Sequence, residues 1–407
     1  MKYVDFVDLT YKPKSSDLIC TFTLEPEGIS LKEAAGAIAA ESSVGTWTEL
    51  TTVKPYVEEL AAHVFRIEGN TAKIAYPMGL FEPGNMPNIL SSVAGNVFGL
   101  KALLNLRLND IELSGELARS FKGPRYGIDG IRKLLQVPER PLVGTIIKPK
   151  LGLKTADHAR VAYEAWAGGC DVVKDDENLS SQEFNPFEDR IVETLESRDQ
   201  AEAETGEKKV YMANITAETD TMVKRAEFVQ EQGGEYVMVD ILTCGWSALQ
   251  TLRDQGFNLV IHAHRAGHAA FTKNPKHGIA MRAIAKVART IGVDQLHVGT
   301  VVGKMSETRE EVLQNIEALK MEMHGLKPVM PVASGGLHPR LVPALIETFG
   351  KDVVIQAGGG IHGHTDGTVA GARAMRQAVD AVLKGTSLEE YAETHKELQI
   401  ALELWKT

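Results

Sequence analysis

The sequence has few cysteines, no long apolar run and no block of basic residues, and each absence excludes a class of protein. Its three cysteines are not spaced as a metal site or a disulfide framework, which indicates a reducing, cytoplasmic location. No run approaches about 18 apolar residues and the N-terminus has no apolar core of signal-peptide type, so we expect no membrane span. The net charge of −10 argues against nucleic acid as the main partner, but it leaves room for a local positive pocket that binds an anionic small molecule.

Residues 1–125 are predicted to form a small α+β domain of ferredoxin-like type. Ser30, followed by Glu33 three residues later, makes a capping box that predicts the start of a helix. The order of elements is βαββαβ, which is typical of a small open-sheet domain. The predicted strands and helices lie, in chain order, at 18–24, 30–40, 62–68, 71–77, 86–98 and 104–113.

The rest of the chain, residues 126–407, follows a regular alternation of apolar strand-like runs and amphipathic helical stretches. Gly123-Pro124 marks the boundary, and eight strand–helix units follow it, which predicts a (β/α)₈ TIM barrel. A final helix is expected from Ser387. The eight predicted strands lie at 142–147, 170–174, 210–215, 236–241, 259–264, 295–301, 329–333 and 353–357.

A barrel places its chemistry at the C-terminal ends of its strands. Charged side chains and glycines collect at the ends of six of the predicted strands, a clustering that favours a functional site over unrelated surface residues. In strand order they are Lys148 and Lys150, then Lys174 to Asn178, then His262, His264 and Arg265, then His297 with Lys304 beyond it, then Ser334, Gly335 and Gly336, and finally Gly358, Gly359 and Gly360.

The stretch Lys174-Asp175-Asp176-Glu177 has two interpretations. Taken alone it is a solvated charge run. In a strand, however, Lys174 and Asp176 point to one side and Asp175 to the other, so Asp175 is left out of the site. Crowding by other lysines and burial lower the pKa of a lysine, and an uncharged Lys174 could take up CO₂ as a carbamate. That carbamate, Asp176 and Glu177 would offer Mg²⁺ three anionic oxygens.

Three further groups also have a functional and a structural interpretation. The glycines after the last two predicted strands could bind phosphate through bare backbone N–H groups, or they could form tight turns. Arg265 and His297 could bind a second phosphate, or they could be a structural ion pair and a core histidine. His262 and His264 could hold zinc, or one of them could pack inside the barrel.

At these positions the chain resembles the large subunit of ribulose-1,5-bisphosphate carboxylase/oxygenase (Rubisco), over nearly its whole length. It looks closest to the archaeal form III enzymes. The matching motifs are Glu41 with Gly45-Thr46-Trp47, Gly95-Asn96, Lys148-Pro149-Lys150-Leu151-Gly152, Gly169 to Asn178, His264-Arg265-Ala266 with His268, His297 to Lys304, Ser334-Gly335-Gly336 and Gly358-Gly359-Gly360.

The resemblance implies catalytic or metal-binding roles for six residues and the use of Mg²⁺. Lys174 would be the carbamylated lysine, with Asp176 and Glu177 as the other metal ligands, and its carbamate would remove the C3 proton of the substrate. Lys148 is similar to the acid/base lysine of later steps and His264 to a second proton acceptor. Beyond these five, Lys304 is similar to the loop lysine that stabilises the new carboxylate.

The resemblance also implies how the substrate, ribulose 1,5-bisphosphate, would be bound together with CO₂ or O₂. The N-terminal residues would complete the active site of a partner subunit, so that a homodimer, possibly part of larger rings, is the minimal unit. The residues implied in substrate binding are Glu41, Thr46, Trp47, Asn96, Lys150, Arg265, His297, Ser334, Gly335, Gly336, Gly358 and Gly359.

The chain departs from the family pattern in three places. Met305-Ser306 replaces the common Leu-Glu-Gly after Lys304, Ile146 stands where many relatives have Thr, and the long C-terminal tail of the plant type is missing. Alternative functions are a Rubisco-like enolase of a methylthio-sugar phosphate, a carbamate-bridged hydrolase, or a non-catalytic phosphate-binding protein. The acid/base lysines argue against the last of these, because a binding protein does not need them.

Overall fold

The computed structural model describes residues 2–48, 50–303 and 307–406. Its contacts divide the chain into two compact units. We call Met1–Gly123, Gly267–Ile291 and Glu322–Leu326 the N-terminal unit, and Pro124–Ala266, Gly292–Met321 and Lys327–Thr407 the barrel unit. Two segments from the C-terminal part of the sequence, Gly267–Ile291 and Glu322–Leu326, are thus grouped with the N-terminal residues. The predicted domain boundary at residue 125 stays a prediction.

The N-terminal unit has the predicted βαββαβ order on one sheet, with the strand order β10-β4-β1-β3-β2. The Ser30–Glu33 capping box is present at the start of α1. The helix predicted over 86–98 was wrong in its second half: α2 ends at Val93, because the backbone turns at Gly95, where a Cβ would lie 2.1 Å from the Ser91 carbonyl oxygen. The elements are η1 (Tyr3–Phe6), β1 (Leu18–Pro26), α1 (Leu31–Glu41), η2 (Pro55–Leu60), β2 (His63–Glu68), β3 (Thr71–Tyr76), η3 (Met78–Leu80), α2 (Met86–Val93), η4 (Asn96–Gly99), β4 (Leu103–Glu112), α3 (Gly115–Arg119), α10 (Ala269–Thr272), β10 (Gly278–Ile279) and α11 (Met281–Ile291).

The barrel unit contains the predicted closed barrel, with parallel strands in the order β11-β12-β13-β5-β6-β7-β8-β9. All eight predicted strands are present, because their β-branched and apolar side chains are buried. The predicted final helix is broken into two, α16 and α17. The elements are α4 (Gly127–Leu135), β5 (Leu142–Ile146), α5 (Thr155–Ala167), β6 (Val172–Lys174), α6 (Phe187–Thr205), β7 (Val210–Asn214), α7 (Thr219–Glu231), β8 (Tyr236–Asp240), α8 (Ile241–Cys244), α9 (Trp246–Asp254), β9 (Val260–His264), β11 (Gln295–His297), α12 (Arg309–Lys320), β12 (Met330–Ser334), η5 (Pro339–Leu341), α13 (Val342–Phe349), β13 (Val354–Gln356), α14 (Gly359–His362), α15 (Thr368–Leu383), α16 (Leu388–Ala392) and α17 (Lys396–Leu404).

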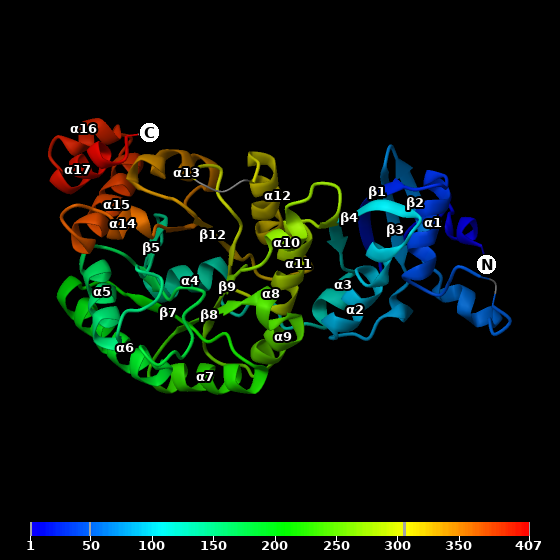
Figure 1. Ribbon diagram of the computed structural model, residues 1–407, viewed down its shortest axis with the longest axis horizontal. Helices are drawn as coiled ribbons and strands as arrows, with labels where there is room; N and C mark the ends of the chain where they lie inside the picture. The colour runs from blue at the N-terminus through cyan, green and yellow to red at the C-terminus, as the bar shows by residue number, and fades with distance from the viewer. Residues whose placement is uncertain (1, 49, 304–306, 407) are drawn as a thin grey trace. The chain divides into compact units, whose positions relative to one another are not determined.

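Helices surround the barrel strands, as Figure 1 shows for α5, α6 and α7 along its outer edge. One cluster of buried apolar residues joins Ile128, Ile131 and Leu135 of α4 to the first residues of the strands, including Val172 and Val210. This packing fills one end of the barrel and leaves the strand C-termini at the other. Within the described part of the chain, no helix has both the length and the apolar composition that crossing a membrane requires.

Candidate active site

The Lys174 side chain is buried at the end of β6, with only 1% of its surface exposed. Its Nζ donates to the Asp175 carbonyl at 2.7 Å and lies 3.8 Å from Glu177 Oε2. Burial lowers the pKa of Lys174, and the surrounding carboxylates, Glu177 foremost, only partly oppose that effect. The solvated interpretation of this stretch is therefore wrong for Lys174, because its side chain is buried.

Asp176 is also buried, and its carboxylate meets two lysines from the end of β5. Lys148 Nζ donates to one oxygen at 2.9 Å, and Lys150 Nζ lies 3.7 Å from the other. Because β5 and β6 are paired and parallel, their C-terminal residues are neighbours at the same edge. The structure thus brings three of the predicted site residues together.

Glu177 and His264 connect β6 to the far side of the barrel. His264 Nε2 lies 3.9 Å from Glu177 Oε2, and Nδ1 is hydrogen-bonded to Asp240 Oδ1 at 2.6 Å. Burial would raise the pKa of Glu177, but its electrostatic interactions, foremost with Lys174, outweigh burial and leave that pKa lowered. Glu177 is therefore an ionised carboxylate, 29% exposed, at the mouth of the barrel.

Asp175 lies on the opposite side of β6 in a buried network of its own. Its Oδ1 accepts from Tyr211 Oη at 2.6 Å and lies 3.1 Å from His158 Nε2. Its Oδ2 accepts from the Asn214 backbone N–H at 2.9 Å and from Arg190 Nε at 3.3 Å. These contacts fix β6 so that its two neighbouring site residues face the barrel mouth.

His262, His297 and Ser334 form a chain of hydrogen bonds across three strand ends. His262 Nδ1 meets Gln295 Oε1 at 2.8 Å, His262 Nε2 meets His297 Nε2 at 2.9 Å, and His297 Nδ1 meets Ser334 Oγ at 2.8 Å. Burial lowers the pKa of both rings well below the usual value, so both are neutral. His262 therefore packs inside the barrel apart from His264, and both ring nitrogens of His297 are already engaged. A phosphate role for His297 stays a prediction.

The Arg265 guanidinium lies beyond β9 and is paired with a carboxylate that the sequence interpretation had not singled out. Its Nη2 donates to Glu307 Oε1 at 2.5 Å. Arg265 is 5% exposed, so the pair is buried. The structural ion pair considered for Arg265 is therefore present. Arg265 also lies just after the end of β9, where other predicted site residues are found.

The predicted glycines form the turns after β12 and β13. Gly335 and Gly336 have φ of +118° and +73°, which glycine adopts without strain. A Cβ on Gly358 would lie 3.1 Å from Lys148 Cε, so this glycine allows the lysine to pass. Gly359 has open space around its Cα hydrogen. Lys304, with Met305 and Ser306, lies outside the described residues.

The predicted N-terminal residues belong to the N-terminal unit. Glu41 ends α1, and its carboxylate accepts from Tyr3 Oη at 2.8 Å. Thr46 is half-buried in the following loop, Asn96 is exposed at the start of η4, and Trp47 is 81% exposed. A tryptophan so open to solvent is unusual in an isolated chain and is typical of an interaction site.

The residues predicted to hold a metal fit a hard divalent cation only when Lys174 is modified. Among residues 2–48, 50–303 and 307–406, no group of three or more His, Cys, Asp and Glu side chains could hold a metal ion. Asp176 and Glu177 supply two carboxylates, and a carbamate on Lys174 would supply the third anionic oxygen donor. The buried amine with its lowered pKa is the group that such a modification needs.

Sequence reasoning missed several polar residues around this site. Asn214 Nδ2 donates to the carbonyls of Asp176, Glu177 and Leu179 at 3.3, 3.1 and 2.8 Å, which holds the segment after β6. Asp240 orients His264. A further link joins Thr145 Oγ1 to His362 Nε2 at 2.9 Å. Asn214 and Asp240 are the last residues of β7 and β8, and that position was the signal available in the sequence.

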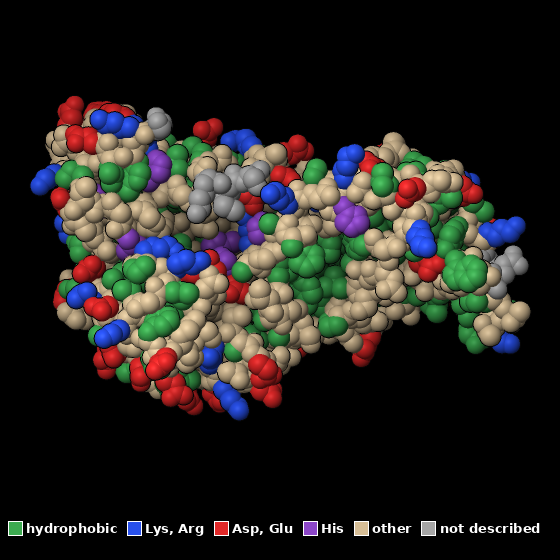
Figure 2. Space-filling view, viewed as in Figure 1, with side chains coloured by type: hydrophobic (Ala, Val, Ile, Leu, Met, Phe, Trp, Pro, Cys, Tyr) green, Lys and Arg blue, Asp and Glu red, His purple; other side chains and the backbone are tan. Residues whose placement is uncertain are grey.

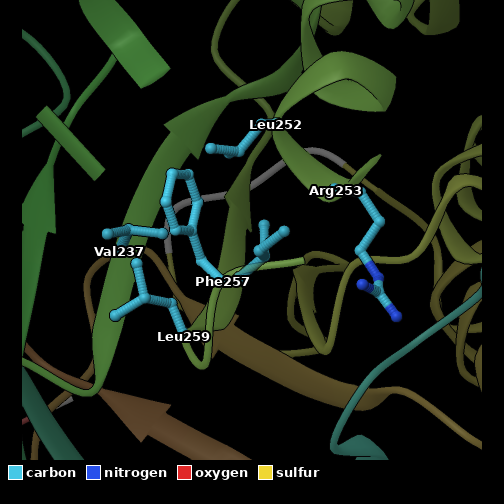
Figure 3. A pocket seen from close by; sticks show the side chains of 6 residues that line it. Val237, Leu252, Arg253, Phe257 and Leu259 are labelled. Atoms are coloured by element: carbon cyan, nitrogen blue, oxygen red, sulfur yellow. The ribbon is translucent and has the colours of Figure 1, made fainter. Parts of the chain in front are cut away.

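A small apolar pocket elsewhere in the barrel unit does not share this chemistry. Figure 3 shows Val237, Leu252 and Leu259 near the ring of Phe257, with Arg253 pointing away from it. The lining residues come from β8, α9, β9 and the segment between α9 and β9. The residues that line the pocket are Val237, Leu252, Arg253, Phe257, Leu259 and Ile261.

The outer surface of the barrel unit carries a different kind of side chain. Figure 2 shows acidic side chains gathered over α6 and α7, at the lower left of the view.

Comparisons with known proteins agree over the full chain. Residues 5–117 match the family described as ribulose bisphosphate carboxylase large chain, N-terminal domain, and residues 127–405 match its catalytic domain. Proteins named ribulose bisphosphate carboxylase from Methanocaldococcus jannaschii and Pyrococcus furiosus are 51% and 54% identical, over 99% of this chain and 100% and 97% of theirs.

Solved structures give the same result. An octameric Rubisco from Pyrococcus horikoshii, in complex with a sulfate ion, matches with a TM-score of 0.97 and 51% identity, covering 100% of this chain and 98% of that one. A dimeric archaeal Rubisco from Hyperthermus butylicus matches with a TM-score of 0.93 and 46% identity, covering 99% of both chains. The chain therefore belongs to the ribulose bisphosphate carboxylase (Rubisco) large-chain family.

Proposed function

We infer that the protein is a ribulose bisphosphate carboxylase, a carbon–carbon lyase that converts ribulose 1,5-bisphosphate and CO₂ to two molecules of 3-phosphoglycerate. The observation that carries this function is the identity of about half of all residues, over the full length, with archaeal enzymes of that name. The meeting of Lys148, Lys174, Asp176, Glu177 and His264 at one end of the barrel supports it. Oxygenation is the side reaction that the family implies.

The proposed cofactor is Mg²⁺, held by Asp176, Glu177 and a carbamate on Lys174. When bound, the metal would act as a Lewis acid on the oxygens of the substrate. Lys174 is suited to carbamylation because burial favours its neutral amine, which is the form that reacts with CO₂. Asn214 would hold the backbone of the two carboxylate ligands in place.

The proposed proton transfers use side chains that already touch the ligand set. The carbamate of Lys174 would take the C3 proton, and His264, oriented through Nδ1 by Asp240, would present Nε2 as a second acceptor. Lys148 is 2.9 Å from Asp176 and would serve as the acid/base lysine of later steps, with Lys150 beside it. Lys304 would stabilise the new carboxylate.

The proposed phosphate sites lie at the two sides of the barrel mouth. Gly336, Gly358 and Gly359 would offer backbone N–H groups to one phosphate, and Thr46 and Trp47 from a second copy of the chain would join them. Arg265, His297 and Ser334 would line the substrate toward the other. Gly335 has the same left-handed backbone as its neighbour and belongs to the first group.

The proposed assembly is a homodimer with shared active sites, in the cytoplasm. Its support is that similar structures include a dimeric and an octameric archaeal Rubisco. The 81% exposed Trp47 would be covered in such an assembly, with Glu41, Thr46 and Asn96 completing the site of the partner subunit.

Incubation with ribulose 1,5-bisphosphate, Mg²⁺ and labelled bicarbonate tests the function directly. We expect labelled 3-phosphoglycerate from the wild type and none from Lys174→Met, which keeps the buried volume but has no amine. The exposed variant Lys224→Met is the control and should keep wild-type turnover. A folded wild-type protein that yields no labelled product, or that instead enolises a methylthio-sugar phosphate, would contradict the inference.

A further inference from the structure

Arg265 has one guanidinium nitrogen bound to a carboxylate and another that is buried without an acceptor. Nη2 donates to Glu307 Oε1 at 2.5 Å. Nη1 has no hydrogen-bond partner within the described parts of the chain. A buried donor without a partner is unfavourable, so this nitrogen offers a place for an acceptor that arrives with a ligand.

The local structure holds Glu307 against Arg265. Glu307 directly precedes Thr308, which caps α12 with a full capping box to Glu311 and so fixes where the chain enters the helix. On the other side, a Cβ at Gly299 would lie 3.1 Å from Arg265 Nη2 and 3.2 Å from Glu307 Cδ. Only a residue without a side chain leaves room for the pair, and Gly299 also has φ of +89°.

The charges of this pair act in two directions. Burial lowers the pKa of Arg265, and the Glu307 carboxylate opposes that effect, so Glu307 helps to keep the buried guanidinium charged. A phosphate that approaches Nη1 meets the same cation but also the negative charge of Glu307. A resident carboxylate therefore stabilises the free protein and disfavours the bound anion.

We propose that Glu307 sets the affinity of the Arg265 subsite, as a resident counter-ion that holds Arg265 in place and weakens phosphate binding at the unpartnered Nη1. The inference rests on the proposed function, in which Arg265 faces a phosphate of the substrate. The consequence concerns release. A buried arginine without a counter-ion would bind a phosphate group very tightly, whereas the charge of Glu307 allows the phosphorylated substrate and products to dissociate. Glu307 is a positioning residue and takes no part in bond making.

Glu307→Gln tests the proposal, because the amide oxygen can still accept from Nη2 while the negative charge is removed. The probe is inorganic sulfate, a dianion of phosphate shape, titrated into the full-length protein at fixed ionic strength by calorimetry. We expect the Kd for sulfate to fall by about ten-fold, the low end of what one charge at about 4–6 Å does to a charged group. The KM for ribulose 1,5-bisphosphate should fall in the same variant, with a smaller change in kcat.

Two further variants make the result specific. Glu310→Gln removes the same charge from an exposed position three residues away, and should leave the Kd as in the wild type. Glu307→Asp keeps the charge on a shorter side chain, and should tighten sulfate binding less than Glu307→Gln does. Because it keeps the ion pair, it also supplies the measurement if the amide variant does not fold.

Arg265→Met separates the failure of this proposal from the failure of the proposed function. If this variant binds sulfate as the wild type does, Arg265 does not bind the anion, and its substrate role and the role of Glu307 both fall. If sulfate binding is lost in Arg265→Met but is unchanged or weaker in Glu307→Gln, only the proposal for Glu307 is overturned. Loss of sulfate binding in Arg265→Met, together with tighter sulfate binding in Glu307→Gln, supports both the substrate role of Arg265 and the role of Glu307.

Discussion

Replacement of Asp175 by asparagine is expected to destabilise the barrel at the base of the active site. Asp175 Oδ1 accepts from Tyr211 and lies 3.1 Å from His158 Nε2, and Oδ2 accepts from the Asn214 N–H and from Arg190. An amide can offer only one acceptor oxygen, so its NH₂ group would either face the Asn214 N–H and Arg190, which can only donate, or replace the acceptor of the Tyr211 hydroxyl. The substitution is isosteric, and the effect therefore comes from charge and hydrogen bonding.

The size of the effect follows from burial. Burial alone would raise the pKa of Asp175, but Arg190 and the other donors outweigh it and hold that pKa far below the usual range. Removing one partner of a buried ion pair costs about 3–5 kcal/mol, because the other charge is left without compensation. We expect a loss of that order in the free energy of unfolding at pH 7, seen as a lower denaturant midpoint with an unchanged slope.

A double-mutant cycle with Arg190→Met tests the cause. If the charge of Arg190 is what makes Asp175→Asn harmful, the double variant should be more stable than the sum of the single losses predicts, by at least about 1 kcal/mol. The exposed variant Glu183→Gln, which removes a charge from the same segment, should change stability by less than about 0.5 kcal/mol. Strict additivity in the cycle, or a loss in Asp175→Asn no larger than that of Glu183→Gln, would refute the reasoning.

Three other predictions concern neighbouring parts of the site. Gly360→Ala should reduce the melting temperature, since its Cβ would lie 2.0 Å from the Leu337 carbonyl oxygen, whereas Gly359→Ala meets no atom within 4 Å and should melt as the wild type while raising the KM for the bisphosphate. Burial lowers the pKa of His362 from 6.5 to about 4. Because the folded protein binds this proton less readily than the unfolded chain, the free energy of unfolding falls as the pH is lowered from 6.5 towards 4. The loss is about 3 kcal/mol, and denaturant titrations at pH 7 and pH 4 should show a smaller acid loss in His362→Gln. Asn214→Ala should release the segment after β6 and weaken the uptake of labelled CO₂ onto the protein in the presence of Mg²⁺, with unchanged uptake counting against that role.

The barrel could be predicted from the sequence because its strands are buried on both faces. Such strands are nearly continuous apolar runs, and the eight runs stand out against amphipathic helices such as α5 and α7. The end of α2 was missed because a helical pattern continues in residues 94–98, while the turn at Gly95 depends on its close approach to Ser91. Periodicity describes which face is buried, and it does not describe where a backbone must change direction.

The predicted site residues were found because their position at strand ends is a property of chain order. Their partners were not found, because partners depend on which strands become neighbours and how far side chains reach. Glu307 and Asn214 belong to no sequence motif. Their roles are recognised only from the structure, in which the Glu307 carboxylate is bound to Arg265 and the Asn214 amide to the carbonyls after β6. The role of His297 shows the same limit, since its two hydrogen bonds join residues 35 and 37 positions away.

The partners also change how ligand binding at this site is understood. Two ionised residues in the described part of the site already have an opposite charge beside them: Asp176 has Lys148, and Arg265 has Glu307. Breaking a buried pair is costly, so a metal or a phosphate gains only the difference between its own contacts and those it replaces. Binding at the barrel mouth is therefore an exchange of counter-ions. At the Arg265 subsite, a variant that removes the charge of Glu307 but keeps a neutral hydrogen bond should therefore tighten anion binding, and a variant that removes the charge of Arg265 should loosen it.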